Sequence, residues 1–378
     1  MLEIVKELDW AAAIAALGIT FVALGLLQPF AARLRLVDHP CGRKDHCVPT
    51  PITGGIAMGL GVIVVGLALS PTRGDGFTGF VLAAAVLLAV GLLDDLCDLR
   101  WQLRIFAQVA AALIMIYVGD VRVEQLGPVF GLPQMSLGAL SVPFTVFATV
   151  GLINAINMID GADGLAGMLV WAALLMLSAA ALYAGNALIA ERMMILMGAV
   201  AAFLAYNLRF PWRPRAKLFM GNAGSAFLGL VIAWFSFRLT QNPGHPVNPV
   251  LALWFVAVPV MDTLVLMYRR IRCRRSPFHA DRNHMHHLMQ EAGFGPTQAA
   301  VVLTAFTLLC GLVVGQAMRM DVPHPVLLGA FVLMCVGWHL LSRRRERAVR
   351  FFRRLRRMLS PRLRPAPHPA LRREPTDA

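Results

Sequence analysis

Eleven apolar runs, each close to the length needed to cross a lipid bilayer, constrain the fold of this chain more than any other feature. They cover residues 9–32, 53–70, 80–97, 103–119, 142–159, 165–184, 190–208, 222–240, 249–268, 298–318 and 325–342. A helix needs roughly 17 to 20 apolar residues to cross the hydrocarbon core, where every backbone polar group must be bonded internally. The pattern predicts an all-α, polytopic integral membrane protein with about eleven transmembrane helices.

The composition excludes a soluble globular domain. The chain is 58% hydrophobic and only 15% charged, which is far from the average of soluble proteins. Its net charge of +14 would suggest nucleic-acid binding in a soluble protein, but the positions of the charges indicate a membrane orientation instead. The six cysteines have no metal-type spacing, so they do not predict a zinc site.

Lys and Arg are distributed unequally between alternate loops. Of the 35 in the chain, 29 lie in the odd-numbered loops and the C-terminal tail. Cytoplasmic loops carry the excess of Lys and Arg in membrane proteins. We therefore expect the N-terminus outside and the C-terminus in the cytoplasm, with a transmembrane domain over 1–342 and a basic, Pro-rich tail over 343–378. The tail begins as a basic helix with apolar residues, which is typical of a segment on anionic headgroups.

The segment 151–167, GLINAINMIDGADGLAG, places amide and carboxyl side chains between two apolar runs. Asn154, Asn157, Asp160 and Asp163 recur every third residue, a spacing that keeps side chains on one face of a helix. Polar groups at such depth mark functional sites, and oxygens beside a glycine-rich exit suit a hard cation with its phosphate. A polar helix cap is the alternative, although a cap needs only one such residue.

A second polar cluster, GLLDDLCDLRWQLR, covers residues 91–104 and contains Asp94, Asp95 and Asp98. Adjacent carboxylates raise one another's pKa unless a cation or a proton intervenes, and we expect Asp94 and Asp98 to share a helix face. This favours a magnesium–phosphate role over solvated charge. Arg104 could clamp a phosphate or extend its charged end to the membrane surface.

Two glycine-containing helix starts are further candidates for anion binding. Arg43, Lys44 and His46 precede the glycine pair that opens the second run, a pattern compatible with a phosphate site and also with an ordinary positive-inside loop. Residues 221–225, GNAGS, form a small-residue turn into a helix, where backbone N–H groups can meet an anion. Tight helix packing is the alternative explanation for this turn.

Arg282, His284, His286 and His287 form a basic imidazole cluster in SPFHADRNHMHH. A zinc site is disfavoured because residues 284 and 286 do not share a helix face and no cysteine is suitably spaced. Arginine and histidine facing a diphosphate is the preferred interpretation.

In their order along the chain, these clusters resemble the polyprenyl-phosphate N-acetylhexosamine-1-phosphate transferases. The resemblance covers nearly all of the chain before the tail and rests on RK with the following His and GG, DDLCD, NAINMIDGADGL, FMGNAGS, PVMDTLVLMYRRIR and SPFHADRNHMHH. It implies that undecaprenyl phosphate attacks the β-phosphate of UDP-GlcNAc and that UMP leaves. GlcNAc-diphosphoundecaprenol would then start a surface glycan such as O-antigen or a common antigen, at the cytoplasmic face of the bacterial inner membrane.

The resemblance also implies roles for individual residues. Asp94 and Asp95 would organise the lipid phosphate, with one of them a base, and Asp160 and Asp163 would be catalytic or nucleotide-site carboxylates. The residues expected to bind substrate are Arg43, Lys44, His46, Arg104, Asn154, Arg282, His284, His286 and His287.

The expected cofactor is Mg²⁺, with Mn²⁺ as a substitute, and the expected metal ligands are Asp95, Asn157 and Asn222. The family motif FMGDAGS has an aspartate where this chain has Asn222. An asparagine offers one neutral carbonyl oxygen, so it should hold the metal less strongly. It also cannot form an acyl-phosphate, which excludes a covalent mechanism through this position.

Alternatives remain at two levels. The same chemistry could use another UDP-N-acetylhexosamine or UDP-MurNAc-pentapeptide, although the RRIR, SPF and DRNHMHH segments look like the GlcNAc branch. A transporter would place acidic groups near span centres within inverted repeats, whereas the carboxylates here cluster at span ends. The expected partners are UDP-GlcNAc, undecaprenyl phosphate and membrane lipids, with no nucleic acid; a homodimer is left open.

Overall fold

The computed structural model describes residues 8–40, 48–69, 76–129, 135–241, 247–277 and 281–359. Within these ranges the chain is mostly helical, as expected, with one small antiparallel pair of strands, β1 (Val37–Asp38) and β2 (Thr50–Pro51). The 3-10 helices are η1 (Gln28–Phe30) and η2 (Gly138–Leu140). The α-helices are α2 (Trp10–Leu27), α3 (Gly54–Leu69), α4 (Phe77–Cys97), α5 (Trp101–Tyr117), α6 (Ser141–Ile159), α7 (Leu165–Tyr183), α8 (Ala187–Asn207), α9 (Gly221–Thr240), α10 (Pro249–Phe255), α11 (Ala257–Arg272), α12 (Met285–Glu291), α13 (Pro296–Arg319), α14 (His324–Ser342) and α15 (Arg345–Leu359).

The apolar runs all correspond to helices, but fewer of them qualify as full membrane crossings. Among the described residues, eight helical segments are long and apolar enough to cross: those of α2, α4, α6, α7, α8, α9, α13 and α14. The apolar helices α3 and α5 are shorter, and α10 with α11 adds a ninth crossing only if this bent pair is one span. The chain is therefore a multi-pass membrane protein, and the count of eleven stays a prediction.

The run 249–268 is two helices bent by 88° at their junction. The break follows from Pro259, the third residue of α11. In a continuous helix, Pro259 would have no N–H for the carbonyl of Phe255 and its ring would clash with that carbonyl. In the first turn of a new helix the missing N–H is harmless. The bend turns α11, with Asp262 and the arginines of its last turn, away from the axis of α10.

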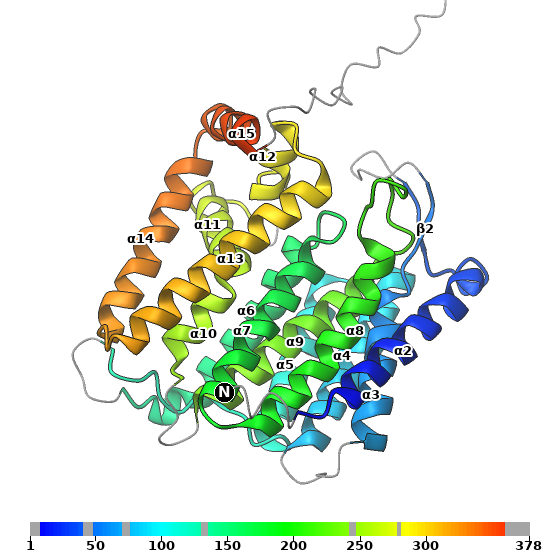
Figure 1. Ribbon diagram of the computed structural model, residues 1–378, viewed down its shortest axis with the longest axis horizontal. Helices are drawn as coiled ribbons and strands as arrows, with labels where there is room; N and C mark the ends of the chain where they lie inside the picture. The colour runs from blue at the N-terminus through cyan, green and yellow to red at the C-terminus, as the bar shows by residue number, and fades with distance from the viewer. Residues whose placement is uncertain are drawn as a thin grey trace, which may run out of the picture.

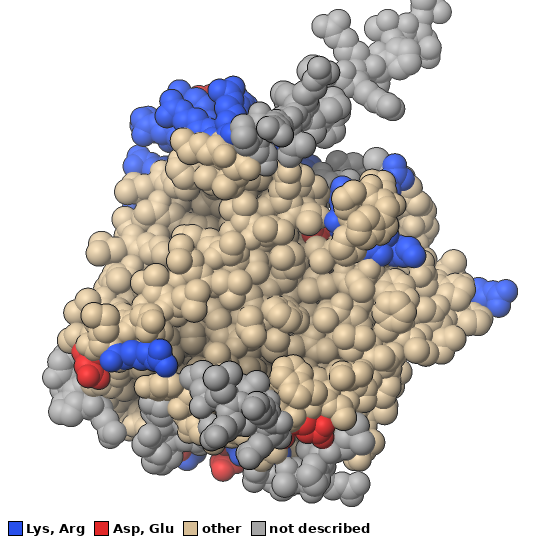
Figure 2. Space-filling model, viewed as in Figure 1, with Lys and Arg blue, Asp and Glu red and all other residues tan. Residues whose placement is uncertain are grey.

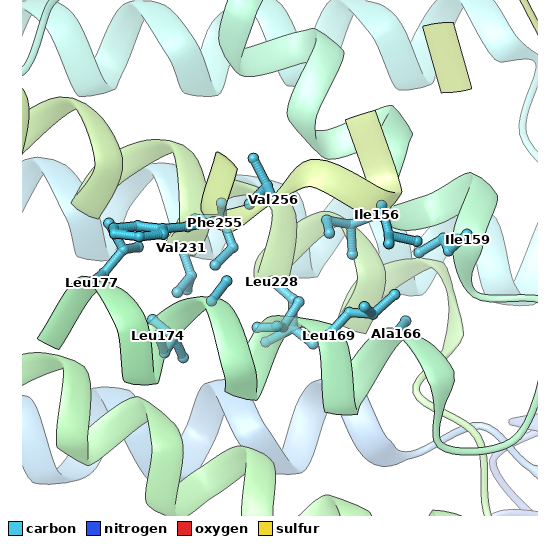
Figure 3. Packing of buried hydrophobic residues seen from close by; sticks show 14 of the residues in the cluster. Ile156, Ile159, Ala166, Leu169, Leu174, Leu177, Leu228, Val231, Phe255 and Val256 are labelled. Atoms are coloured by element: carbon cyan, nitrogen blue, oxygen red, sulfur yellow. The ribbon is translucent and has the colours of Figure 1, made fainter. Parts of the chain in front are cut away.

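Helix α9 lies at the centre of the bundle. It is the most buried of the candidate spans and packs against α3, α4, α6 and α7. Figure 3 shows apolar side chains of the surrounding core; the labelled residues are Ile156, Ile159, Ala166, Leu169, Leu174, Leu177, Leu228, Val231, Phe255 and Val256. Because lipid is as apolar as these side chains, close packing rather than exclusion of water stabilises such contacts.

Small residues let the neighbouring backbones approach α9 closely. A Cβ on Gly55 of α3 would overlap the backbone of Gly224, and a Cβ on Gly91 of α4 would overlap the backbone of Ala223. Gly229 makes a similar approach to the backbone of α6. Small residues at helix crossings are typical of membrane bundles. These contacts fix the start of α9 relative to α3, α4 and α6.

The helix ends that carry the polar clusters gather at one end of the bundle. The ends of α4 and α6 and the starts of α5, α7 and α9 lie there, with α12 and α15 over the same end (Figure 1). The first described helix, α2, begins at the opposite end (Figure 1). In Figure 2 a broad uncharged surface separates the two ends, and Lys and Arg gather over α15. The expected basic helix of the tail is thus present as α15, and residues 360–378 lie outside the described residues.

Candidate active site

Asp95, in the last turn of α4, caps the N-terminus of α9. Its Oδ1 accepts the N–H of Asn222 at 2.8 Å, and its Oδ2 accepts the N–H of Ala223 at 3.3 Å. The first N–H groups of a helix have no partner within the helix and form the positive end of its dipole, so they stabilise a carboxylate. Gly221 has a φ of 73°, and a Cβ there would overlap the Asp95 carboxylate. The anion expected at the GNAGS turn is therefore supplied, in this structure, by the chain itself.

Asn157, near the end of α6, reaches the same point from another helix. Its Nδ2 donates to the Oγ of Ser225 at 2.8 Å and to the Oδ1 of Asn222 at 3.2 Å. Three helices thus bring together Asp95, Asn157 and Asn222, the three residues that the sequence suggested as metal ligands.

The donor set at this point fits a magnesium ion. Among the described residues, no three His, Cys, Asp or Glu side chains converge as a metal site. Magnesium, however, is usually held by one or two carboxylates together with water and substrate phosphates. The Asp95 carboxylate and the Oδ1 of Asn222 supply such oxygens, and Asn157, which presents its Nδ2 to Asn222 here, would add its oxygen by turning its amide. The Asp160 carboxylate is close enough to interact electrostatically with Asp95.

Asp160 and Asp163 lie in the turn between α6 and α7. The sequence predicted that four polar residues share one helix face. Only Asn154 and Asn157 do, because α6 ends at Ile159. Gly164, with a φ of 80°, allows the chain to enter α7.

Asp163 is held by an ion pair, whereas Asp160 has a raised pKa. Asp163 pairs with Arg209, and the N–H of Gly164 donates to the Oδ1 of Asn207 at 2.6 Å. Burial, with the nearby charges of Asp163 and Asp95, raises the pKa of Asp160 from 3.8 to about 7. Loss of the proton from Asp160 is therefore sensitive to any cation placed beside it.

The Asp94 carboxylate contacts the linker between α4 and α5 and the first turn of α5. Its Oδ1 accepts the N–H of Leu99 at 2.8 Å, and its Oδ2 lies 3.3 Å from the Nη1 of Arg104. The expectation that Asp94 and Asp98 share a helix face is wrong, because α4 ends at Cys97. Asp98 is exposed and adopts a φ of 49°, a left-handed conformation that aspartate tolerates better than most residues.

A cleft between α4, α5, α6 and α9 opens beside these residues. Its polar lining includes Asp94, Arg104, Asn157 and Asn222, and most of the rest is apolar, with Leu87, Val90, Trp101, Ile105, Ile153 and Met158. Asn154 also lines it and donates to the Oε1 of Gln108 at 2.6 Å and to the carbonyl of Val150 at 2.8 Å. The cleft extends from these apolar side chains to Asn157 and Asn222, which lie beside Asp95.

The three histidine rings lie close together against the turn between α6 and α7. The rings of His286 and His287 are 4.0 Å apart, and that of His284 lies 5.7 Å from His286. His286 is fully buried, and neither ring nitrogen has a hydrogen-bond partner among the described residues. A Cβ on Gly161 would collide with this ring. Burial, then the charges of the neighbouring histidines and Arg282, lowers the pKa of His286 well below 6.5, which favours the neutral ring.

Sequence reasoning assigned no role to Asp262, although a single carboxylate in an apolar run is itself a signal. Asp262 is buried in α11, and its Oδ2 lies 2.8 Å from the Nδ1 of His284. Its Oδ1 accepts the N–H of Met285 at 3.2 Å and the indole N–H of Trp338 at 3.1 Å. Asp262 thus orients the first ring of the cluster and caps α12.

A second unexpected pair supports the segment before the histidines. The buried Arg270 donates through Nε to the Oδ2 of Asp281 at 2.9 Å and through Nη1 to the carbonyl of Pro277 at 2.7 Å. Burial alone would raise the pKa of Asp281, but the Arg270 and Asn283 N–H hydrogen bonds outweigh it and lower the pKa. The exposed Arg282 follows directly.

Three of the expected substrate ligands, Arg43, Lys44 and His46, lie outside the described residues. The glycine pair that follows them has a packing role, since the N–H groups of Gly54 and Gly55 donate to the carbonyls of Phe219 and Met220 at 3.0 and 2.9 Å. Those two amides are thus not directed at an external anion.

Comparison with known proteins finds relatives along most of the chain. Residues 77–240 match the model of glycosyl transferase family 4. The chain is similar to the undecaprenyl-phosphate α-N-acetylglucosaminyl 1-phosphate transferase of Yersinia pestis, at 35% identity over 89% of this chain and 92% of the relative. It is also similar to the protein of the same name from Haemophilus influenzae, at 34% identity over 78% of this chain and 82% of the relative.

Proposed function

The chain belongs to glycosyl transferase family 4, a family of phosphoglycosyl transferases, and on that premise we propose that it transfers GlcNAc-1-phosphate from UDP-GlcNAc to undecaprenyl phosphate. An oxygen of the lipid phosphate forms a bond to the β-phosphorus of the nucleotide sugar, and the bond from that phosphorus to the UMP oxygen breaks. The products are UMP and GlcNAc-diphosphoundecaprenol, which starts a surface glycan such as O-antigen or a common antigen.

One observation carries the proposal: α4, α6 and α9 bring Asp95, Asn157 and Asn222 together between an apolar cleft and a histidine cluster. A reaction between a membrane lipid and a water-soluble nucleotide needs both kinds of surface at one point. Proximity and orientation of two bound reactants are a major source of catalysis.

We assign the lipid acceptor to the cleft between α4, α5, α6 and α9. Its apolar lining suits a polyprenyl chain, and Arg104 at its polar end suits the phosphate. The Asp94 pair with Arg104 orients that guanidinium, because a charge-assisted hydrogen bond fixes direction as well as distance. Asp94 or Asp95 accepts any proton that the lipid phosphate still carries.

We assign the nucleotide sugar to the side formed by the turn between α6 and α7 and the histidine cluster. His286 lies against Gly161 of this turn, fully buried and with two ring nitrogens unpartnered among the described residues, so a ligand can hydrogen-bond to it only by displacing the side chains that cover it. Arg282 supplies positive charge for the leaving UMP. His284, whose ring is oriented by Asp262, holds the neighbouring histidines in position. These groups stabilise charge that develops on the leaving oxygen.

Asp95, Asn157 and Asn222, with the charge of Asp160, would hold the magnesium ion. When bound, the ion would neutralise the diphosphate and so make its β-phosphorus easier to attack. Asn222 provides one neutral oxygen and cannot carry a phosphoryl group as an acyl-phosphate, so a covalent intermediate at this position is excluded.

The cellular setting follows from the same proposal. The polar end of the bundle faces the cytoplasm, where UDP-GlcNAc is found, and the membrane is the bacterial inner membrane. Residues 1–342 form the transferase unit and 343–378 a basic tail.

The test is UMP release by the purified protein with undecaprenyl phosphate and a panel of UDP-sugars. We expect the highest kcat/KM with UDP-GlcNAc. Faster use of UDP-GalNAc or UDP-MurNAc-pentapeptide would replace the sugar assignment, and substrate uptake into vesicles without UMP release would replace the enzyme by a transporter.

A further inference from the structure

Helix α15 is fastened to the helix that carries the histidine cluster. Ala348, Val349 and Phe352, on its inner side, are buried, and α15 packs against α12 and α14. The ring of Phe352 meets that of Phe294, just after α12, edge to face at 6.5 Å. These contacts recur at helical spacing, so one side of α15 is fixed.

Arg345, the first residue of α15, also binds both ends of the α12 segment. Its Nη2 lies 2.7 Å from the Oε2 of Glu291, at the end of α12. Its Nη1 lies 3.5 Å from the carbonyl of Arg282 and 3.4 Å from the Oδ1 of Asn283, just before the histidines. A displacement of α15 would therefore be transmitted to Arg282 and His284.

The outer side of α15 is a strip of arginines. Arg347, Arg350 and Arg354 are exposed and have no carboxylate partner among the described residues. They lie on one face of the helix, at three- and four-residue spacing. Besides Arg345, the remaining exposed arginines of this region are Arg343, Arg344, Arg353 and Arg357, and Glu346 is the one acidic residue of α15.

Apolar side chains border this strip on one side. Phe351 is 48% exposed and Met358 is 79% exposed, and their seven-residue separation places them on the same edge of the helix. A basic face beside an apolar edge is typical of a helix that lies in the headgroup region of a bilayer.

The start of α15 is fixed near the membrane by the helix before it. The candidate span α14 ends at Ser342, three residues before α15 begins, and Figure 2 shows the resulting basic patch at the border of the uncharged surface. We propose that the Arg347, Arg350 and Arg354 strip binds anionic phospholipid headgroups, and that this attachment, through Arg345, holds the histidine cluster in its nucleotide-binding arrangement. The second part rests on the proposed function.

The attachment can be tested without an activity assay. Amide hydrogen exchange of residues 345–359 would be measured in nanodiscs of phosphatidylcholine and of phosphatidylcholine mixed with phosphatidylglycerol. We expect exchange to slow by about tenfold or more in the anionic discs, because each arginine near such a surface adds attraction. Equal exchange in the two lipids would overturn the proposal.

Charge-matched variants show whether the strip itself is responsible. R347Q/R350Q/R354Q should lose the response to phosphatidylglycerol, whereas R362Q/R364Q/R372Q, with the same loss of charge further along the tail, should keep it. An equal loss in both variants would assign the effect to the overall charge of the tail and contradict our proposal.

The coupling is tested by kinetics in the same nanodiscs. For the native protein we expect phosphatidylglycerol to lower the KM for UDP-GlcNAc at least threefold. R345Q should keep the lipid-dependent protection of α15 but lose the change in KM. A KM in R345Q that still follows the lipid would refute the coupling alone, and absence of UMP release in every lipid would refute the proposed function while the exchange result stands.

Discussion

At the residue scale, Asp160 sets the expected pH dependence. Its pKa is raised from 3.8 to about 7 by burial and by the charges of Asp163 and Asp95. If the ionised carboxylate is the active form, turnover should fall as the pH drops through about 7. A bound divalent cation favours ionisation, so a higher magnesium concentration should move this limb of the pH–rate profile to lower pH. A limb that does not respond to magnesium would contradict a carboxylate beside the metal.

The same shift affects folding. Because the pKa of Asp160 is higher in the folded chain than in the unfolded one, its contribution to stability is fully present below pH 3.8 and is lost as the pH rises through about 7. D160N removes this titration, so at neutral pH the variant should be no less stable than the native protein even though its turnover falls.

Asn222 leads to a prediction about metal affinity. Its Oδ1 accepts a hydrogen bond from Asn157, and an aspartate would keep that acceptor while adding a negative charge. A charged ligand binds a cation more strongly than a neutral one, and about 1.4 kcal/mol corresponds to tenfold in affinity. N222D should lower the magnesium concentration for half-maximal UMP release at least severalfold.

Two outcomes would contradict the expectation for Asn222. Equal magnesium dependence of native protein and N222D would show that residue 222 is not a ligand. If the native protein released no UMP at any magnesium concentration and N222D did release it, the native chain would be an inactive relative.

At the element scale, the position of α9 depends on the glycines that contact its start. A Cβ on Gly55 would overlap the backbone of Gly224, which cannot move as a side chain can, whereas a Cβ on Gly151 of α6 would meet no atom within 4 Å. Overpacking of this kind costs about 1–3 kcal/mol. G55A should therefore lower the thermal midpoint of the purified protein and reduce turnover, while G151A should do neither. Equal midpoints for the two variants would contradict this account of the helix crossing.

Hydrophobic periodicity located the elements better than their ends. It identified every apolar run, because burial in lipid or in a helix core requires such runs. It did not reveal the 88° bend between α10 and α11, since apolar residues continue across the junction and only Pro259 marks it. The run 80–97 does end with α4 at Cys97, but the expectation that Asp94 and Asp98 share a helix face extended the helix by one residue too many, to a left-handed residue that is not a glycine.

At the scale of the whole molecule, much of the clustering in the site was predictable. Asp95, Asn157 and Asn222 are far apart in sequence, and their expected proximity came from the resemblance to a family. The hydrogen bonds from Asn222 and Ala223 to Asp95 could not be inferred, because they depend on how closely Gly91 lets α4 approach α9. The contact between Asp262 and His284 was not predicted, because the sequence did not reveal the bend that brings α11 to α12.

The expected orientation in the membrane rests on the 29 of 35 Lys and Arg that fall in alternate predicted loops and the tail. Reporter fusions after residues 45, 98, 213, 280 and 350 should read as cytoplasmic, and those after 75, 130 and 245 as extracytoplasmic. An extracytoplasmic signal after residue 280 would separate the histidine cluster from the cytoplasmic nucleotide and would rule out the site as we assign it.

The central claim is that phosphosugar transfer takes place where α4, α6 and α9 meet at Asp95. UMP release from UDP-GlcNAc and undecaprenyl phosphate, compared between the native protein, D95N and D98N, tests it most directly. D98N is the matched control, because Asp98 is exposed and asparagine also tolerates its left-handed backbone. We expect D95N to lose roughly two or more orders of magnitude in turnover, as is typical of a positioned catalytic group, and D98N to remain close to native. Native turnover in D95N, or an equal loss in D98N, would contradict the claim.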